Sequence, residues 1–146
     1  MGLIAQLLEK RSPVVHIVSP HQTVSEAVAI MAARKVGAVP VVIDGRLVGI
    51  FSERDVVRRV VWVNRSAEKT EVGEVMTPDP LTASPSDERA LAVRKMDAVG
   101  CRHLPVILHG SVVDMLSIRD LIFGELEERA DDLESLRKYV MGPGAV

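Results

Sequence analysis

Two short sequences of this chain have the residue types and spacing to bind a ligand: residues 52–55 (Ser-Glu-Arg-Asp) and residues 117–120 (Ser-Ile-Arg-Asp). A serine followed three residues later by an acidic residue is typical of a helix start, where backbone N–H groups have no helical partner and carry partial positive charge. A phosphate could bind to such groups. The carboxylate could accept charge-assisted hydrogen bonds from two neighbouring hydroxyl groups. The pattern therefore indicates binding of a small anion that carries hydroxyl groups.

A second interpretation of the same residues stays open. Ser-x-x-Asp is also an ordinary helix cap, which contributes about 1 kcal/mol to the stability of its helix. Capping alone would explain both sequences.

The two sequences lie in two copies of one longer pattern. A shift of 65 positions aligns Ser19-Pro20 with Ser84-Pro85, Met31 with Met96, and Pro40 with Pro105, without a gap. Each copy is too short to bury a core of its own. We therefore expect one compact body with pseudo-twofold symmetry and paired clefts where the halves meet.

The composition favours a small ligand over a nucleic acid. Of the 146 residues, 47% are hydrophobic and 26% are charged, which suits one globular domain with a buried core. Aromatic residues make up only 3% and the net charge is −2, so the stacking rings and basic surface of nucleic-acid binders are absent from the sequence.

Several other classes of protein are disfavoured. The single cysteine, Cys101, excludes an internal disulfide and a multi-cysteine zinc site, which suits a reducing cytoplasm. No apolar run approaches the roughly 20 residues that cross a bilayer. The sequence shows no nucleophile with a base, no GxxxxGK phosphate loop and no metal-ligand cluster, so we expect no enzyme.

Each copy predicts the order strand, helix, strand, strand, helix. In the first copy a β-branched run predicts a strand over 14–18, and the capping box at Thr23 predicts a helix to about Lys35. Strands over 39–43 and 47–51 flank Asp44-Gly45, a pair that suits a tight hairpin turn. The valine-rich residues 56–63 favour a strand by propensity, but the cap at Ser52 predicts a helix. Its buried face would hold four valines: Val56, Val57, Val60 and Val61.

The second copy repeats this order and continues into a tail. We expect residues 72–78 to open it, followed by a strand over 81–83, a helix over 86–99 and strands over 104–108 and 112–116. Apolar residues at helical spacing continue to Met141, and Gly142 and Pro143 should end that helix. The apolar stripe of this helix could pack on the rest of the same chain or on another subunit. The expected divisions are an N-terminal lead-in over 1–12, a first repeat over 13–63, a linker over 64–75, a second repeat over 76–123, and a C-terminal helix and tail over 124–146.

A family resemblance rests on the sequence Gly-hydrophobic-x-Ser-x-x-Asp at residues 49–55, preceded by the hairpin from Ala38 to Val48, and on residues 102–106 (Arg-His-Leu-Pro-Val). This pattern resembles the cystathionine β-synthase (CBS) domain, in two tandem copies over roughly residues 13 to 123. The resemblance implies an α/β (α+β) fold of two β-α-β-β-α repeats, regulatory binding of AMP, ATP, ADP, NAD(H) or an S-adenosyl compound, and a homodimer.

The resemblance also implies where the ligands bind. Each cleft would combine the Ser-x-x-Asp helix of one repeat with the early strand and pre-proline segment of the other, so that the carboxylate holds ribose hydroxyls and the strands hold the purine. Copy two has Asp114 where copy one has Gly49, and that carboxylate could repel a phosphate, so we favour the first cleft. The first cleft would contain Ser52, Arg54, Asp55, Thr82, Arg102, His103 and Pro105, and the second would contain Ile17, Ala38, Val39, Pro40, Ser117, Arg119 and Asp120.

The expected function is therefore a non-catalytic, cytoplasmic sensor of an adenine nucleotide that signals through a separate protein partner. The alternative is a structural dimerisation module with vestigial clefts. Neither the nucleotide, the number of filled clefts nor the partner can be read from the residues.

Overall fold

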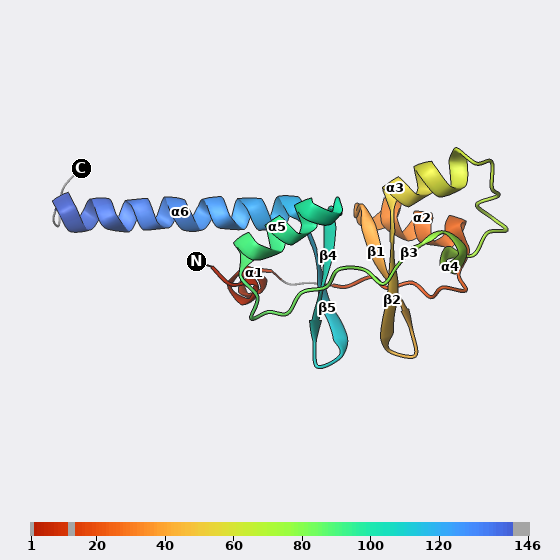
Figure 1. Cartoon of the computed structure of the whole chain (residues 1–146), viewed down its shortest axis with the longest axis horizontal. Helices are drawn as coiled ribbons and strands as arrows, with labels where there is room; N and C mark the ends of the chain where they lie inside the picture. Colours follow the sequence, from red (N-terminus) through yellow and green to blue (C-terminus); the bar gives the residue numbers. More distant parts are fainter. Residues whose placement is uncertain (1, 12–13, 142–146) are drawn as a thin grey trace.

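The computed structural model describes residues 2–11 and 14–141 as two similar halves that lie side by side (Figure 1). Each half holds a helix, an antiparallel hairpin and a second helix, which confirms the predicted mixed α/β fold of two repeats with a C-terminal helix. The elements of the first half are α2 (Val24–Arg34), β1 (Ala38–Ile43), β2 (Arg46–Ser52), α3 (Glu53–Asp55) and η1 (Val56–Val61). Those of the second are α5 (Arg89–Val99), β4 (His103–Leu108), β5 (Ser111–Ser117) and α6 (Ile118–Met141).

The two predicted hairpins form as expected, and they match each other in detail. Asp44 and Gly45 turn the first hairpin with φ angles of 50° and 75°, and His109 and Gly110 turn the second with 52° and 79°. Positive φ at both turn residues matches the twist of the strands that follow. A bulge interrupts the register between Val41 and Val42 and again between Val106 and Ile107, which are 65 positions apart. The sequence repeat is therefore also a structural repeat.

The first predicted strand of each copy is wrong. Only Val18 pairs with β1, opposite Val41, and only Ala83 pairs with β4, opposite Val106. Val18 donates to the Pro40 carbonyl at 3.0 Å and accepts from the Val42 N–H at 2.8 Å. The next bond of a parallel ladder would need an N–H at Pro40, which proline lacks, and Pro105 ends the second ladder in the same way.

The segment after Ser52 is helical, as predicted against its strand propensity, but its buried face differs from the expectation. η1 is a π-helix, in which the Trp62 N–H donates to the Val57 carbonyl five residues earlier, at 3.0 Å. This wider turn separates residues that an α-helix would align. Val60 is buried, whereas Val57 and Val61 are 61% and 65% exposed.

Helix α5 begins later than predicted. The Asp87 side chain accepts from the Ser84 N–H at 2.8 Å, which holds residues 84–87 in a turn. The helix therefore starts at Arg89 instead of Ser86.

Short helices are exchanged between the two halves. Helix α1 (Ile4–Glu9) packs on the second half, and Ile4 lies in that half's core. Helix α4 (Val72–Val75) packs on the first, where Val72 and Val75 are buried, and strand β3 (Thr77–Pro78) pairs with β2. Residues 72–78, which were expected to open the second copy, therefore pack on the first half. The division of the chain into lead-in, repeats and linker remains a prediction.

Each half has its own apolar core, and six positions of one core correspond to six of the other by the shift of 65. The first contains Val18, Val24, Ala27, Met31, Val39, Val41, Phe51, Val60, Val72 and Val75. The second contains Ile4, Ala83, Ala92, Met96, Leu104, Val106, Leu116 and Leu121. Strands β1 and β2 both contact β5, so the hairpins meet where the halves join.

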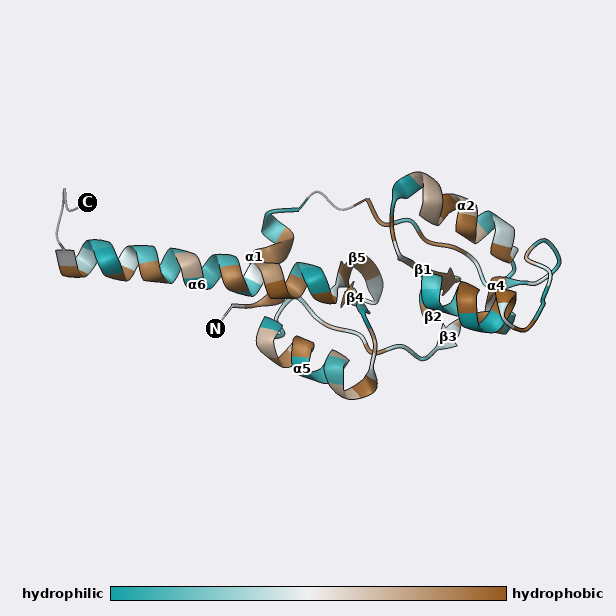
Figure 2. Ribbon diagram, turned by 90° about the horizontal axis from the view of Figure 1, so that it is seen from above, coloured by the Kyte–Doolittle hydropathy of each residue, from teal (hydrophilic) through white to brown (hydrophobic). Residues whose placement is uncertain are grey.

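Helix α6 extends away from the body as one continuous helix (Figures 1 and 2). Its helical course to Met141 confirms the prediction, and residues 142 and 143 lie outside the described residues. Leu121 packs in the second core, but the apolar stripe beyond it is exposed, with Leu133 at 68% and Val140 at 71%. Among the described residues, no helix is both long and apolar enough to cross a membrane.

Candidate functional site

A cleft of about 680 Å³ lies where the helix start at Ser52 faces the second half, and we call it the first cleft. Five of the seven residues predicted for it line it: Ser52, Arg54, Asp55, Arg102 and His103. Thr82 lines a separate hollow beside the hairpin turns, and Pro105 is buried within β4. The two halves both contribute, because Arg54 Nη1 donates to the Gly100 carbonyl at 3.0 Å across the junction.

Asp55 is held by the helix start and by a residue that sequence reasoning missed. Its Oδ2 accepts from the Ser52 N–H at 3.0 Å and from the Ser52 hydroxyl at 3.1 Å. Its Oδ1 accepts from the Thr77 hydroxyl at 3.1 Å. The capping role of Asp55 is therefore realised, and the residue is only 5% exposed.

These contacts limit what Asp55 can offer a ligand. A carboxylate has about four acceptor positions, and three of them are taken by Ser52 and Thr77. One ribose hydroxyl can therefore bind directly. A second can bind only if the hydroxyl of Ser52 or Thr77 rotates away.

Arginines supply the positive charge of the first cleft. Arg59 Nε lies 3.7 Å from Asp55 Oδ1, and its Nη1 donates to the Met76 carbonyl at 2.7 Å. Arg58 and Arg102 are exposed and form no ion pair within the described part of the chain. Their guanidinium groups are free to contact an anion, whereas Arg59 is held in place.

The second cleft, of about 420 Å³, shares Gly37 and His103 of its lining with the first cleft. Five of its seven predicted residues line it: Ala38, Val39, Pro40, Ser117 and Asp120. Ile17 is outside its lining and 51% exposed, and Arg119 turns away to place its guanidinium 5.5 Å from the ring centre of Phe123.

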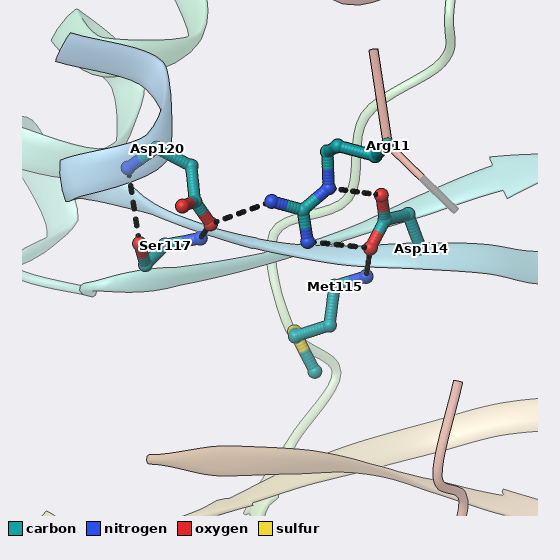
Figure 3. A network of polar contacts seen from close by, with 5 residues as sticks. All are labelled: Arg11, Asp114, Met115, Ser117 and Asp120. Carbon is teal, nitrogen blue, oxygen red and sulfur yellow. Dashed lines mark hydrogen bonds and ion pairs between the residues drawn. The ribbon is translucent and has the colours of Figure 1, made fainter. Parts of the chain in front are cut away.

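Arg11 occupies the polar end of the second cleft (Figure 3). Its Nε and Nη2 donate to the two carboxylate oxygens of Asp114 at 2.8 and 3.2 Å, and its Nη1 lies 3.5 Å from Asp120 Oδ2. Partial burial by itself would lower the pKa of Arg11, but the hydrogen bonds and charges of the two aspartates raise it. Asp114 lines the second cleft, and its charge is balanced by an arginine that sequence reasoning missed.

His103 lines both clefts, from the strand between them. Burial lowers its pKa, partly opposed by the charges of Glu53 and Asp120 and reinforced by Arg102 and Arg54. Its imidazole is therefore neutral at pH 7 and adds no charge to either cleft. Burial also raises the pKa of Cys101, which lines only the first cleft, so its thiol is protonated at pH 7.

No group of three or more His, Cys, Asp or Glu side chains within residues 2–11 and 14–141 could hold a metal ion.

Comparison with known proteins points to one family. The family model for the CBS domain matches residues 7–61 and residues 72–126. The mitochondrial CBS domain-containing protein CBSX3 of Arabidopsis thaliana is 34% identical over 125 residues, which are 82% of this chain and 61% of CBSX3. The chain thus spans less than two thirds of that relative.

Solved structures show the same fold. The CBS-domain containing protein ATU1752 from Agrobacterium tumefaciens superposes with a TM-score of 0.79 at 28% identity, covering 85% of this chain and 99% of ATU1752. CBSX2 in complex with AMP gives a TM-score of 0.69 at 24% identity, covering 87% and 98%. The CBS domain pair of MJ0100, in complex with 5′-methylthioadenosine and S-adenosyl-L-methionine, gives 0.73 at 22%, covering 85% and 97%.

Proposed function

The chain belongs to the CBS domain family and carries two tandem copies of the domain, and from this premise we propose that it is a non-catalytic regulatory module that binds an adenine nucleotide of the AMP, ATP or NAD(H) type. The observation that carries the proposal is the first cleft. Its volume of about 680 Å³ falls in the range of small-molecule sites. It joins a buried carboxylate to a group of arginines.

The residues of the first cleft divide between the parts of a nucleotide. Asp55 would accept a ribose hydroxyl, and the N–H groups at the helix start after Ser52 would face the phosphates together with Arg54 and Arg102. His103 would form a wall for the purine. Thr82 and Pro105 lie outside the lining of this cleft and have no direct role in the proposal.

The ligands of two structural neighbours support the adenosyl class. CBSX2 was solved with AMP, and the MJ0100 domain pair was solved with 5′-methylthioadenosine and S-adenosyl-L-methionine. These ligands share adenine and ribose and differ in the charge of the group at the 5′ position. The arginines of the first cleft favour a ligand with phosphate there.

The test uses the single cysteine as a reporter of the first cleft. Because Cys101 lines that cleft alone, bound AMP should slow its alkylation by a maleimide at pH 7.5. AMP at 100 times its dissociation constant should also add about 2.7 kcal/mol to the free energy of unfolding, a rise of several degrees in Tm. Inosine monophosphate tests whether the response needs the adenine ring. Unchanged alkylation and unchanged Tm with AMP, ATP, NADH and S-adenosylmethionine would contradict the proposal.

Regulation would act through a separate protein, as a cytoplasmic energy or redox sensor. A ligand that contacts both halves can favour one relative tilt of the halves over another. Arg54 and Gly100 lie on opposite sides of the junction and already share a hydrogen bond, so a ligand beside them would change the same contact.

We also propose a homodimer, through helix α6. Leu126, Leu133 and Val140 recur every seven residues, Ile122 lies four residues before Leu126, and Leu136 lies three residues after Leu133, which is the spacing of a coiled-coil stripe. All five side chains are at least 43% exposed in the single chain. Asp132 and Arg137 flank the stripe with opposite charges, which allows ion pairs between two copies. A second copy of α6 is the occupant that fits this stripe.

Charge placed on the stripe should separate the subunits. Leu133→Glu/Leu136→Glu is expected to halve the mass measured by size-exclusion chromatography with light scattering, since four like charges would meet in a dimer. Glu134→Gln, on the polar face of α6, is the control and should leave the mass unchanged. An unchanged mass for the double variant would contradict pairing through α6.

A further inference from the structure

The two halves differ at a pair of positions that face each other. In the first half Met76 lies against Gly49: a Cβ atom added to Gly49 would sit 2.5 Å from Met76 Sδ and 2.8 Å from the Thr77 carbonyl. By the shift of 65 positions, Met76 corresponds to Arg11 and Gly49 corresponds to Asp114. An apolar contact in one half is thus an ion pair in the other.

This ion pair holds the second cleft closed to an anion. Asp114 is 3% exposed and places a negative charge in the lining of the second cleft, whereas the equivalent Gly49 lies outside the lining of the first cleft. Arg11 balances that charge, and its third contact reaches Asp120, which corresponds to Asp55 of the first cleft. Asp120 Oδ2 also accepts from the Ser117 N–H at 2.9 Å. Asp120 is therefore engaged by a guanidinium, as Asp55 is by Arg59 in the first cleft. The second cleft differs in the added carboxylate of Asp114, which holds Arg11 at two points.

The second cleft also lacks replacements for the other arginines. Shifted by 65 positions, Arg58 and Arg59 become Phe123 and Gly124, and Arg102 corresponds to Gly37. Apart from Arg11, Lys35 is the one lysine or arginine in the described lining of the second cleft. A phosphate there would meet two carboxylates and few free cations.

We infer that Arg11 is an internal ligand of the second cleft and a specificity-determining residue, so that each chain binds one nucleotide, in the first cleft. This inference rests on the proposed function. It predicts that the Arg11–Asp114 pair, and not the volume of the second cleft, prevents a nucleotide from binding there.

The first test counts binding sites by isothermal titration calorimetry and native mass spectrometry. In separate titrations, the wild type should bind one AMP per chain and one adenosine per chain. Arg11→Met/Asp114→Gly, which copies the residues of the first half, should bind two adenosine molecules, because Asp120 is released and adenosine brings no phosphate. Two AMP per wild-type chain, or a single adenosine per double-variant chain, would overturn the inference.

The second test needs no variant and covers the case in which the double variant does not fold. Photolabelling of the wild type with 8-azido-AMP, followed by peptide mapping, should mark the segment around Cys101 and Arg102 and leave the segment around Val15 and His16 unmarked. Label in the latter segment would overturn the inference. If AMP neither binds nor labels the wild type at all, the proposed function itself fails.

Discussion

Arg89→Met is expected to lower the free energy of unfolding by about 3 kcal/mol, the lower end of the cost of breaking a buried ion pair. Arg89 is 4% exposed, its Nε lies 3.3 Å from Glu125 Oε2, and its Nη2 contacts Glu128. Without the guanidinium, two acidic side chains of α6 face α5 unpaired. Urea denaturation should report the loss, with a fall in Tm of roughly 6–12 °C for a chain of this size.

A double variant separates the charge effect from a packing effect. The residues 65 positions before Arg89 and Glu125 are Val24 and Val60, which pack together in the first core. Arg89 Nε and Glu125 Oε2 are buried and make no hydrogen bond within the described residues. Replacing such a pair by apolar residues of similar volume is often neutral or stabilising. Arg89→Met/Glu125→Leu should therefore recover most of the loss, because Glu128, whose side chain is 30% exposed, is then the one former partner of Arg89 that keeps an unpaired charge, and a loss as large as that of Arg89→Met alone would contradict the role of unpaired charge.

The repeat and the hairpins could be predicted because their signals are local. Asp44-Gly45 carries its own turn geometry, and Thr23 with Glu26 carries its own cap. The prediction of a first strand in each copy was wrong for a reason that was also present in the sequence. Pro40 and Pro105 remove the N–H that a longer ladder needs, but this matters only once the partner of each segment is known.

The grouping of some of the site residues in one cleft could be predicted for a similar reason. Ser52 and Asp55 lie in one helical turn, so their association needs no knowledge of the fold. Thr77 and Arg11 reach the two clefts from short segments that the halves exchange, and the sequence repeat does not show that exchange. Asp114 was recognised because it breaks the repeat at a glycine. Arg11 likewise breaks the repeat, because it corresponds to Met76. Comparing these two positions would have indicated Arg11 as the partner of Asp114.

Asp55→Ala is expected to weaken AMP binding by roughly 10- to 150-fold, the loss of one charge-assisted hydrogen bond of about 1.5–3 kcal/mol. The structure limits Asp55 to one free acceptor position, because Ser52 and Thr77 occupy the others. Calorimetric titration at 25 °C gives the affinity directly. The substitution also removes a helix cap, at a cost of about 1 kcal/mol in stability, so a control must carry the same cost.

Asp120→Ala is that control. Asp120 closes the same capping box, accepting from the Ser117 N–H at 2.9 Å and donating its own N–H to the Ser117 hydroxyl at 3.0 Å. The two variants should therefore lose the same helix cap, and Asp55→Ala should also lose the hydrogen bonds from the Ser52 and Thr77 hydroxyls. Only Asp55→Ala should lose AMP affinity, because Asp120 is engaged by Arg11 in the second cleft. Equal losses of affinity would show that capping, and not a ribose contact, is what both aspartates provide, and a larger loss for Asp120→Ala would place the nucleotide in the second cleft.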